Sequence, residues 1–523
     1  MSCQADCIYP KRDRQIKVSQ RSSKIPFLIG EVADAAFATR FRQLLTNQAL
    51  NHTLRTSYPD DNQITELAQT ACPFVIATNA RFLVRVALKS LDGSFHIVRK
   101  GRIWELLEEY LQSPHTFDAL SCCKIMALLA LGELYSSSCR AQGTSIPGLA
   151  FFSHASKMHD LLQGRPSVDT VEISLLLCLY ALSINRRHSA YFLASSAVRH
   201  CLHLNRIWWS AYMLDHTTAS ISSQIASVSD DEIFVDLPSC TGVTGTQQAD
   251  FQHTELFIAR IQLARVTGSI IKSVYGRAQE TKPFLQRVQQ ALQDLKQWLQ
   301  RLPPDIQMDS GSSHSKPIAV QSLHLAFSQS VILATRPVLL YMLRMHKEAK
   351  GEAPATAERM VSNTVQTLAE ACIRCARHSY ATVVESWIEG SFQTFDYFNT
   401  RCLFSSATIL AISSLLDGPD SSENRENFEV ASQLIKKLQN AGSFSATEFC
   451  HHLEAIKENI QGFSATGNSS PDHEPTQFMA SGMALAEPSL EAFLQSEQDL
   501  PDIDFFLDNA QVGGLYWPMY SPL

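Results

Sequence analysis

The sequence lacks the short motifs that mark common catalytic and nucleotide-binding sites. GxSxG, HExxH, GxxxxGKS/T and GxGxxG are all absent, so nothing indicates a serine nucleophile, a zinc-protease site or a phosphate-binding turn. Only 21 of the 523 residues are glycine, and none cluster as a phosphate-cradling loop requires. Because no nucleophile–base pair is evident either, we expect that the protein is not an enzyme.

Long apolar runs are also missing. No run reaches the 18 or more apolar residues of a membrane span, and the longest candidates, 125–131 and 174–184, read as buried helices. The N-terminus has no apolar signal-peptide core. We therefore expect neither membrane association nor secretion. Most of the 13 cysteines lie inside apolar runs, which favours buried thiols in a reducing compartment.

The charges are few and unevenly placed. Charged residues make up 18% of the chain and the net charge is −7, so the whole chain offers no positive field for nucleic acid. Residues 11–24, however, hold six basic side chains and one acid, whereas residues 491–508 hold six acids and no base. A basic head and an acidic tail are typical of a chain that meets a polyanion at one end and proteins at the other. Two solvated termini remain the alternative.

Residues 25–465 repeat a helical pattern. Apolar side chains recur at three- and four-residue spacing, as in Ile103, Leu106, Leu107 and Leu111, and residues 323–343 are apolar enough for a central helix. Alternating strand patterns are scarce. The sequence therefore predicts an all-α domain of roughly 14 to 18 helices between a polar head, 1–24, and a polar tail, 466–523.

Three clusters of polar residues have a weak resemblance to metal or redox sites. Cys372 and Cys375 have suitable spacing, but they lie in a helical run without a second pair. His451 and His452 would point to different sides of a helix, and Glu454 alone completes no site. The acidic stretch 230–236 lacks the glycine and terminal glutamate of a calcium loop. We expect core thiols, an unliganded histidine pair and a solvated acidic loop.

Two parts of the chain resemble fungal transcription factors. Cys7-Ile8-Tyr9-Pro10-Lys11-Arg12 is similar to the end of their zinc binuclear (Zn2Cys6) cluster. Farther along, successive segments resemble blocks of the fungal-specific transcription factor domain, and their order and spacing are more specific than any one of them. Those blocks are 148–152, 165–171, 185–191, 206–215, 230–238 and 336–339.

The resemblance implies an all-α, multi-helix regulatory domain, the middle homology region, with disordered termini. Within it, Trp208 and Trp209 would fill neighbouring core pockets. Arg186 and Arg187 would form ion pairs inside the body rather than contact DNA. Arg206 before the pair and Asp215 after it are both candidates to pair with a charge on another helix.

The chain departs from the family at its head. An intact cluster holds two zinc ions with six cysteines, and only Cys7 matches a ligand, the last one. We therefore expect an N-terminally truncated or divergent cluster that binds no zinc in this chain. The basic residues that follow are candidates for contacts to DNA phosphates: Lys11, Arg12, Arg14 and Lys17. The heptad dimerisation helix of the family is not evident, and the chain runs directly from residue 204 into the tryptophan block.

The tail interleaves acids with bulky apolar residues between positions 490 and 507. This alternation is typical of disordered activation segments that dock on a coactivator as a short helix. The candidate docking residues are Phe493, Phe505, Phe506 and Leu507. The alternative is a C-terminal helix that packs on the chain's own body, although Pro501 argues against one continuous helix.

These features predict a nuclear transcriptional regulator, an activator of RNA polymerase II genes. Its expected partners are DNA, if the cluster is completed upstream or through a relative, coactivators, and a second subunit in a homo- or heterodimer. The alternative is an interaction or small-molecule-sensing module that acts without its own DNA binding. An enzyme is the least supported class.

Overall fold

The structure is a computed structural model that describes most of the helical region. The described residues are 32–48, 50, 57–112, 117–138, 146–162, 167–200, 205–222, 224–233, 235–239, 253–276, 282–307, 317–351, 363–416, 418–464, 485 and 487–495. They form 17 α-helices and contain no strand. The predicted all-α class and the predicted number of helices are confirmed.

The helices vary in length from 8 residues in α17 to 34 residues in α12. In chain order they are α1 (Asp34–Thr46), α2 (Asp61–Gln69), α3 (Ala77–Leu91), α4 (Lys100–Gln112), α5 (Ala119–Ser136), α6 (Leu149–Leu162), α7 (Val168–Ser183), α8 (Arg187–His200), α9 (Asn205–Ser222), α10 (Thr254–Tyr275), α11 (Phe284–Gln300), α12 (Ile318–Gly351), α13 (Asn363–Ile388), α14 (Tyr397–Ser413), α15 (Ser421–Asn440), α16 (Phe444–Ser464) and α17 (Pro488–Gln495). Two short 3-10 helices, η3 (Asp230–Glu232) and η5 (Pro304–Ile306), lie in the connections.

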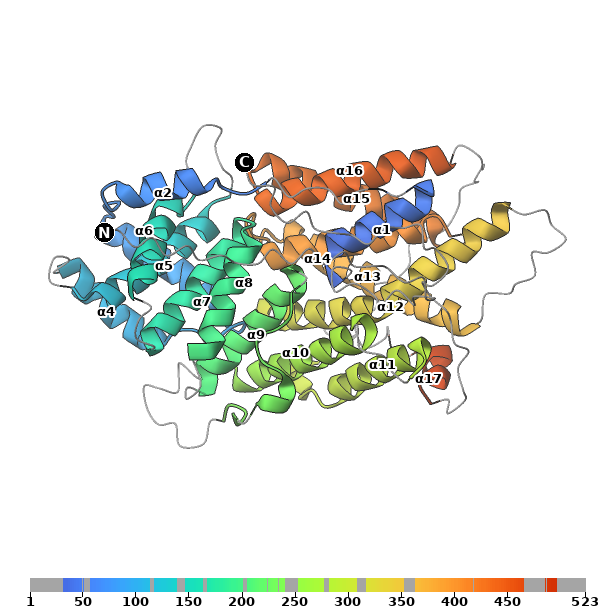
Figure 1. The fold of residues 1–523 in the computed structure, drawn as a ribbon, viewed down its shortest axis with the longest axis horizontal. Coiled ribbons are helices and arrows are strands. Elements are labelled where there is room, and N and C mark those ends of the chain that lie inside the picture. Colours follow the sequence, from blue (N-terminus) through green and yellow to red (C-terminus); the bar gives the residue numbers. More distant parts are fainter. Residues whose placement is uncertain are drawn as a thin grey trace, which may run out of the picture.

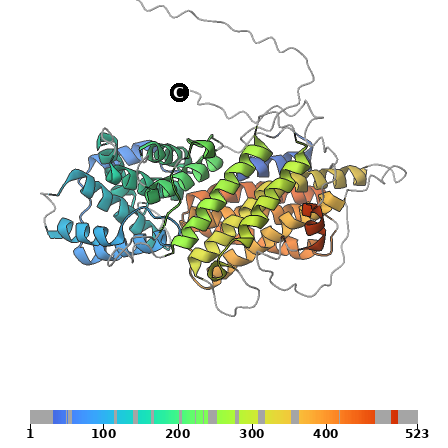
Figure 2. The ribbon, with the colours of Figure 1, turned by 90° about the horizontal axis from the view of Figure 1, so that it is seen from below.

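The helices pack in two halves that lie side by side (Figures 1 and 2). One half contains α2–α9, in which α3 packs on α5, α2 on α6 and α7 on α8. The other contains α10–α17, in which α12, α13, α14, α15 and α16 pack in succession. Although α1 comes first, it packs on α14 and α16 of the second half. The described chain therefore runs from α1 in the second half to α2 in the first half and returns through α9 and α10.

Local sequence signals explain where several helices begin. Asp118 caps α5 by accepting hydrogen bonds from the backbone N–H groups of Leu120 and Ser121, at 2.9 and 3.2 Å. Ser167 and Thr170 form a reciprocal capping box at the start of α7. Such caps satisfy N–H groups that have no partner within the helix. They fix the starts of two helices that contribute many residues to the core.

A glycine turn leads into α6, at the first block of the family resemblance. Gly148 has a φ of +76°, and a Cβ there would lie 2.2 Å from the carbonyl oxygen of Ala130. Its N–H donates to the Glu133 carboxylate at 2.9 Å, and Tyr180 donates to the neighbouring Pro147 carbonyl at 2.7 Å. Only glycine tolerates both the positive φ and the close approach to α5.

Two helices are long and apolar enough to cross a membrane by length and composition alone. They are α5 and the 318–349 part of α12, and 61% and 67% of the relevant windows are buried inside the body. Core helices surrounded by other helices share this composition. The predicted central helix at 323–343 is confirmed as part of α12, which contacts α10, α11, α13 and α14.

Candidate functional sites in the helical body

Most of the candidate site residues at the two ends of the chain lie outside the described residues. They remain predictions: Cys7, Lys11, Arg12, Arg14 and Lys17 at the head, and Phe505, Phe506 and Leu507 in the tail. Of the candidate residues at the two ends, the described part of the chain includes Phe493. The sites below are therefore formed by Phe493 and by residues of the helical body.

Phe493 corrects the expectation that the candidate docking residues stand free in the tail. It lies on α17, where it is 7% exposed, and Leu490 and Leu494 are buried beside it. Helix α17 packs on α11 and α13. The apolar face at 490–494 is therefore buried against the chain's own body, which offers a complementary surface. Here the packed-helix alternative describes the structure.

A buried cluster of charges fastens α1 to the second half. The two oxygens of the Asp34 carboxylate accept from Arg336 of α12 and Arg401 of α14, and the Arg336 pair measures 2.7 Å. Arg336 also donates to the Val32 carbonyl at 2.7 Å, and its guanidinium lies over the Phe37 ring. Three helices from distant parts of the sequence thus share one site.

The same cluster supplies a hydrogen bond that the central helix lacks at its proline. Pro337 lies inside α12 and has no N–H to offer the Leu333 carbonyl, the usual partner four residues earlier. Tyr275 of α10 donates its hydroxyl to that carbonyl at 2.7 Å and accepts from Arg336 Nε at 3.1 Å. The Arg-Pro pair of the family resemblance is therefore a packing device that links α10, α12 and α1.

A second buried cluster joins the two halves at the start of α8. Arg187 pairs with Glu448 of α16, with 3.1 Å between Nη2 and Oε1, and lies over the Tyr397 and Phe449 rings. Asn185 donates to the same carboxylate at 2.8 Å and accepts from Arg187 Nε. Arg186 pairs with Asp61 of α2. The prediction that both arginines form ion pairs within the body is confirmed.

The tryptophan block of α9 is core, as predicted. Trp208 and Trp209 are 2% and 0% exposed, and their rings meet edge to face with 4.7 Å between centroids. Trp209 Nε1 donates to the Asp236 carbonyl at 2.9 Å, and Tyr212 donates its hydroxyl to the Asp230 carboxylate. The acidic stretch that contains η3 is exposed, as expected, but α9 also anchors it at two points.

Asp215 is held by hydrogen bonds from serine residues and not by the ion pair that was expected. Its buried carboxylate accepts hydrogen bonds from Ser195 Oγ, from Ser227 Oγ and from the Ser227 backbone N–H, at 2.8, 2.8 and 2.7 Å. These polar donors satisfy the carboxylate without a basic partner. Asp215 thereby joins α8, α9 and the segment that follows α9. The side chain of Arg206 lies outside the described residues.

The weak metal and redox candidates are structural. Cys372 and Cys375 are fully buried, and burial raises the pKa of the Cys372 thiol to about 12 and that of Cys375 further. Thiols with raised pKa values are poor nucleophiles and ligands at neutral pH. His451 is exposed whereas His452 is buried. Among the described residues, no group of three or more His, Cys, Asp or Glu is placed to hold a metal ion.

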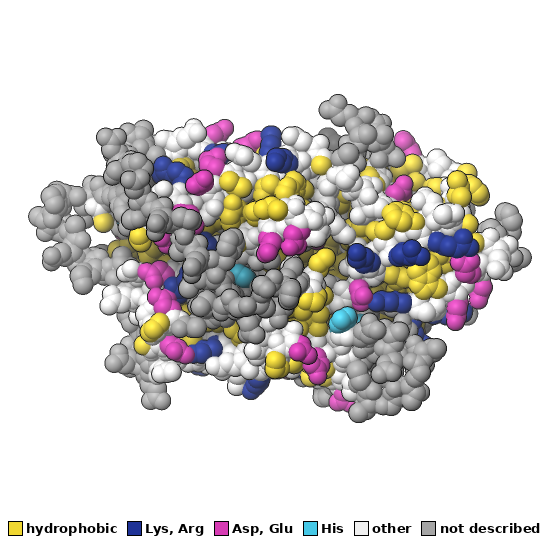
Figure 3. Space-filling view, turned by 180° about the vertical axis from the view of Figure 1, so that it is seen from behind, with side chains coloured by type: hydrophobic (Ala, Val, Ile, Leu, Met, Phe, Trp, Pro, Cys, Tyr) yellow, Lys and Arg dark blue, Asp and Glu magenta, His cyan; other side chains and the backbone are white. Residues whose placement is uncertain are grey.

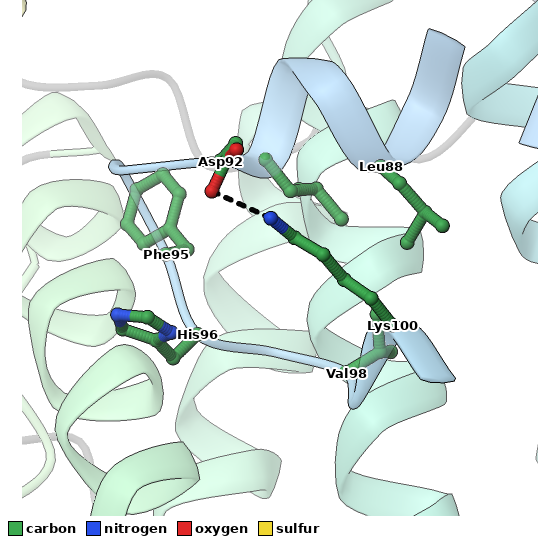
Figure 4. Close-up of a pocket in the computed structure, with 7 residues that line it drawn as sticks. Leu88, Asp92, Phe95, His96, Val98 and Lys100 are labelled. Atoms are coloured by element: carbon green, nitrogen blue, oxygen red, sulfur yellow. Dashed lines mark ion pairs between the residues drawn. The ribbon is translucent and has the colours of Figure 1, made fainter. Parts of the chain in front are cut away.

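Two cavities are small. One, of about 20 Å³, lies where α3 leads into α4, and the Lys100–Asp92 ion pair of 2.7 Å spans its side with His96 and Phe95 nearby (Figure 4). The other, of about 150 Å³, is lined by residues of α15 and α16 that include Phe428, Glu429 and Lys457. A drug-sized ligand usually occupies roughly 300 Å³ or more. Neither cavity offers that volume.

The surface carries both signs of charge. On the face seen in Figure 3, a short row of Lys and Arg side chains lies at one end, with Asp and Glu around it and over the rest of that face. A protein that binds DNA through its body usually presents an extended positive surface. This face presents no such surface among its described residues.

Comparison with known proteins relates one segment of the body to a known family. Residues 203–302, which span α9, η3, α10 and α11, match the family described as the fungal specific transcription factor domain. This match confirms the resemblance of the helical body to that domain, and it does not extend to the zinc cluster at the head.

The relatives are transcription regulators by name. A Schizosaccharomyces pombe protein, called an uncharacterized transcriptional regulatory protein, is 22% identical over 472 residues, which cover 84% of this chain and 57% of the relative. An Aspergillus niger protein, called transcription regulator galc, is 19% identical over 384 residues, covering 57% and 46%. The chain thus spans about half the length of these curated relatives. No solved structure matches it.

The sequence did not reveal the most connected buried residues. Asp34, Arg401 and Glu448 stood out in no motif. Arg336 was noticed only within a family block, although an arginine in an apolar run signals a buried ion pair. That signal indicates that a partner exists, but not which of the 51 acidic residues it is.

Proposed function

We propose that this protein regulates transcription of RNA polymerase II genes in the nucleus, with the helical body as its regulatory and interaction module. The observation that carries the proposal is the match of residues 203–302 to the fungal-specific transcription factor domain. In the structure that segment is built into the core through Trp208, Trp209 and the anchored acidic stretch. The names of two relatives support the same role.

DNA contacts are assigned to the head rather than to the body. The chain is acidic overall and the viewed face carries mixed charge, whereas Lys11, Arg12, Arg14 and Lys17 form a compact basic stretch. Such residues bind phosphates and set position, whereas base contacts confer specificity. In a complete zinc cluster, Cys7 would supply the last of six thiolates, and the cluster would read the bases.

Protein partners are assigned to the tail and to a second subunit. The acids and aromatics at 496–508 have the composition of a segment that docks on coactivators. A homo- or heterodimer would place two basic heads on two half-sites of DNA. We assign no catalytic role, because the sequence has no catalytic motif and both relatives are named as regulators.

The test is selection from a pool of random double-stranded DNA with the purified chain. We expect enrichment of a defined sequence. A variant with Lys11→Ala, Arg12→Ala, Arg14→Ala and Lys17→Ala should bind more weakly, and the slope of log affinity against log salt should fall by about 3 to 4, as four lost phosphate contacts require.

The opposite outcome supports the second candidate function. If neither chain enriches any sequence and the salt slopes are equal, the head does not bind DNA. The protein would then act as an interaction module that reaches DNA only through a partner.

A further inference from the structure

Helix α17 lies on the body in a way that resembles a bound peptide. It has eight residues, and its buried side chains Leu490, Phe493 and Leu494 follow the i, i+3, i+4 spacing of one helix face. Its packing partners are α11 and α13. In Figure 1 it lies at the edge of the second half, beside α11.

Polar contacts fix α17 at both of its ends. At the C-terminal end, Gln289 and Gln293 of α11 donate their side-chain amides to the backbone carbonyls of Phe493 and Leu494, each at 2.6 Å. Carbonyls in the last turn of a helix have no partner within the helix. At the N-terminal end, Arg374 of α13 pairs with Glu487. The amides therefore recognise a helix end whatever side chains it carries.

A charge pair adds selectivity for an acidic helix. Lys296 of α11 contacts Glu491 with 2.6 Å between Nζ and Oε1. Gln289, Gln293 and Lys296 recur at i, i+4 and i+7, so they form one stripe of α11, while Val288, Leu292 and Leu295 form the neighbouring core stripe. Helix α11 thus has one face for the core and a second face for an acidic helix.

We propose that the α11–α13 groove, defined by Gln289, Gln293, Lys296 and Arg374, is a docking site for short acidic amphipathic helices, and that α17 is its exchangeable occupant. The partner that fits is a helix of another protein with apolar residues at i, i+3 and i+4. It also carries acidic residues at i−3 and i+1, the positions of Glu487 and Glu491 relative to Leu490. This proposal concerns docking alone and does not depend on DNA binding.

Several properties of α17 favour exchange over permanent packing. Eight residues are too few to form a stable helix in water alone. The Glu487 and Glu491 carboxylates of its two ion pairs are 35% and 46% exposed, so water screens both pairs in part. Residues 465–487 separate α17 from α16, so α17 competes as a tethered ligand with a high effective concentration. An external helix must overcome that advantage, or bind when α17 is engaged elsewhere.

The test measures binding of a fluorescent peptide of residues 485–497 to the full chain by anisotropy. In the full chain, the triple variant Leu490→Ala, Phe493→Ala, Leu494→Ala empties the groove. We expect the peptide to bind this variant at least tenfold more tightly than the unaltered chain. Adding Lys296→Glu should weaken binding at least tenfold, whereas Lys437→Glu, on an exposed residue of α15, should not. A peptide with Glu491→Lys should recover affinity for the Lys296→Glu chain.

Two results would overturn the proposal. Peptide binding that is absent, or equal in the Lys296→Glu and Lys437→Glu chains, would show that the groove does not recognise the helix. The unaltered chain could also form dimers that the triple variant does not form. That result would show that α17 of one copy occupies the groove of a second copy, and not the groove of its own chain.

Hydrogen exchange on the unaltered chain tests the proposal even if the triple variant does not fold. Residues 487–495 should exchange at least tenfold faster than the buried parts of α11 and α13, because they open without unfolding the body. Exchange as slow as in α11 and α13 would make α17 a permanent core helix.

Discussion

Asp34 and Arg336 lie 302 positions apart in the sequence and form a buried ion pair, with 2.7 Å between Oδ1 and Nη1. Burial raises the pKa of the Asp34 carboxyl, but the charges of Arg401 and Arg336 outweigh it, so the pKa lies below its ordinary value. Asp34 is therefore ionised at neutral pH and shares its charge between two helices. The first described helix is held to the second half by this contact.

Replacing Asp34 should destabilise the body strongly. Asp34→Ala leaves Arg336 and Arg401 without their shared carboxylate, and removing one partner of a buried pair typically costs about 3–5 kcal/mol. Denaturant unfolding should show this loss. Lys436→Ala, which removes an exposed ion pair with Glu454, should leave the midpoint unchanged. Equal effects of the two substitutions would show that the cluster does not fasten α1.

This cluster also shows why part of the structure could be predicted from the sequence and part could not. The mostly apolar stretch at 323–343 predicted the central helix because helical periodicity is a local property. Whether Arg336 pairs with Asp34 depends on which helices meet in space, which the pattern along one helix does not contain. The family blocks supplied some of this information, since they placed Arg186 and Arg187 inside the body.

Helix α17 illustrates the same limit at a candidate site. Acids interleaved with apolar residues describe both a free docking segment and an amphipathic helix on a surface. The choice was decided by Gln289 and Gln293, about 200 positions earlier. Nothing in residues 487–495 indicates that such amides exist elsewhere in the chain.

Trp208 provides a test of the tryptophan block. Trp208→Ala should destabilise the protein by about 3–5 kcal/mol, because a large side chain in a close-packed core leaves a cavity that relaxes only partly. Its ring lies on the Tyr212 ring with 5.6 Å between centroids. Phe192→Ala is a suitable control, since Phe192 is 68% exposed. A thermal midpoint unaffected by Trp208→Ala would contradict its core role.

His159 should make stability depend on pH. Burial, with a smaller contribution from His200, lowers its pKa from 6.5 to about 4, and its Nε2 lies 2.9 Å from Ser174 Oγ. The unfolded chain therefore binds a proton before the folded chain does. Stability contributed by neutral His159 is present at pH 7 and is lost as the pH falls from 6.5 towards 4.

The comparison between the unaltered chain and His159→Gln isolates this contribution. Between pH 7 and pH 5, the unaltered chain should lose about 2 kcal/mol more unfolding free energy than the variant. Measurement by denaturant titration at both pH values cancels the other titrating groups. Parallel losses in the two proteins would mean that His159 is protonated or accessible in the folded state.

The tail beyond α17 remains the best candidate for transcriptional activation. Acids at 497, 499, 502 and 504 precede Phe505 and Phe506, and Asp508 follows them, a composition that keeps aromatic residues soluble until a coactivator groove accepts them. Because Phe493 is buried on the body, we predict that Phe505 and Phe506 are the residues that activate transcription. A fusion of residues 485–523 to a heterologous DNA-binding domain should activate a reporter.

Activation should fall when Phe505 and Phe506 both become alanine, because the helix that docks would lose its largest apolar side chains. The same fusion with Phe493→Ala separates the two parts of the tail. If Phe493→Ala abolishes activation while the Phe505 and Phe506 substitutions do not, the α17 face is the activating surface and its burial on α11 and α13 opposes activation. If all three fusions are silent at equal abundance, the tail does not activate, and α17 serves only the groove on which it lies.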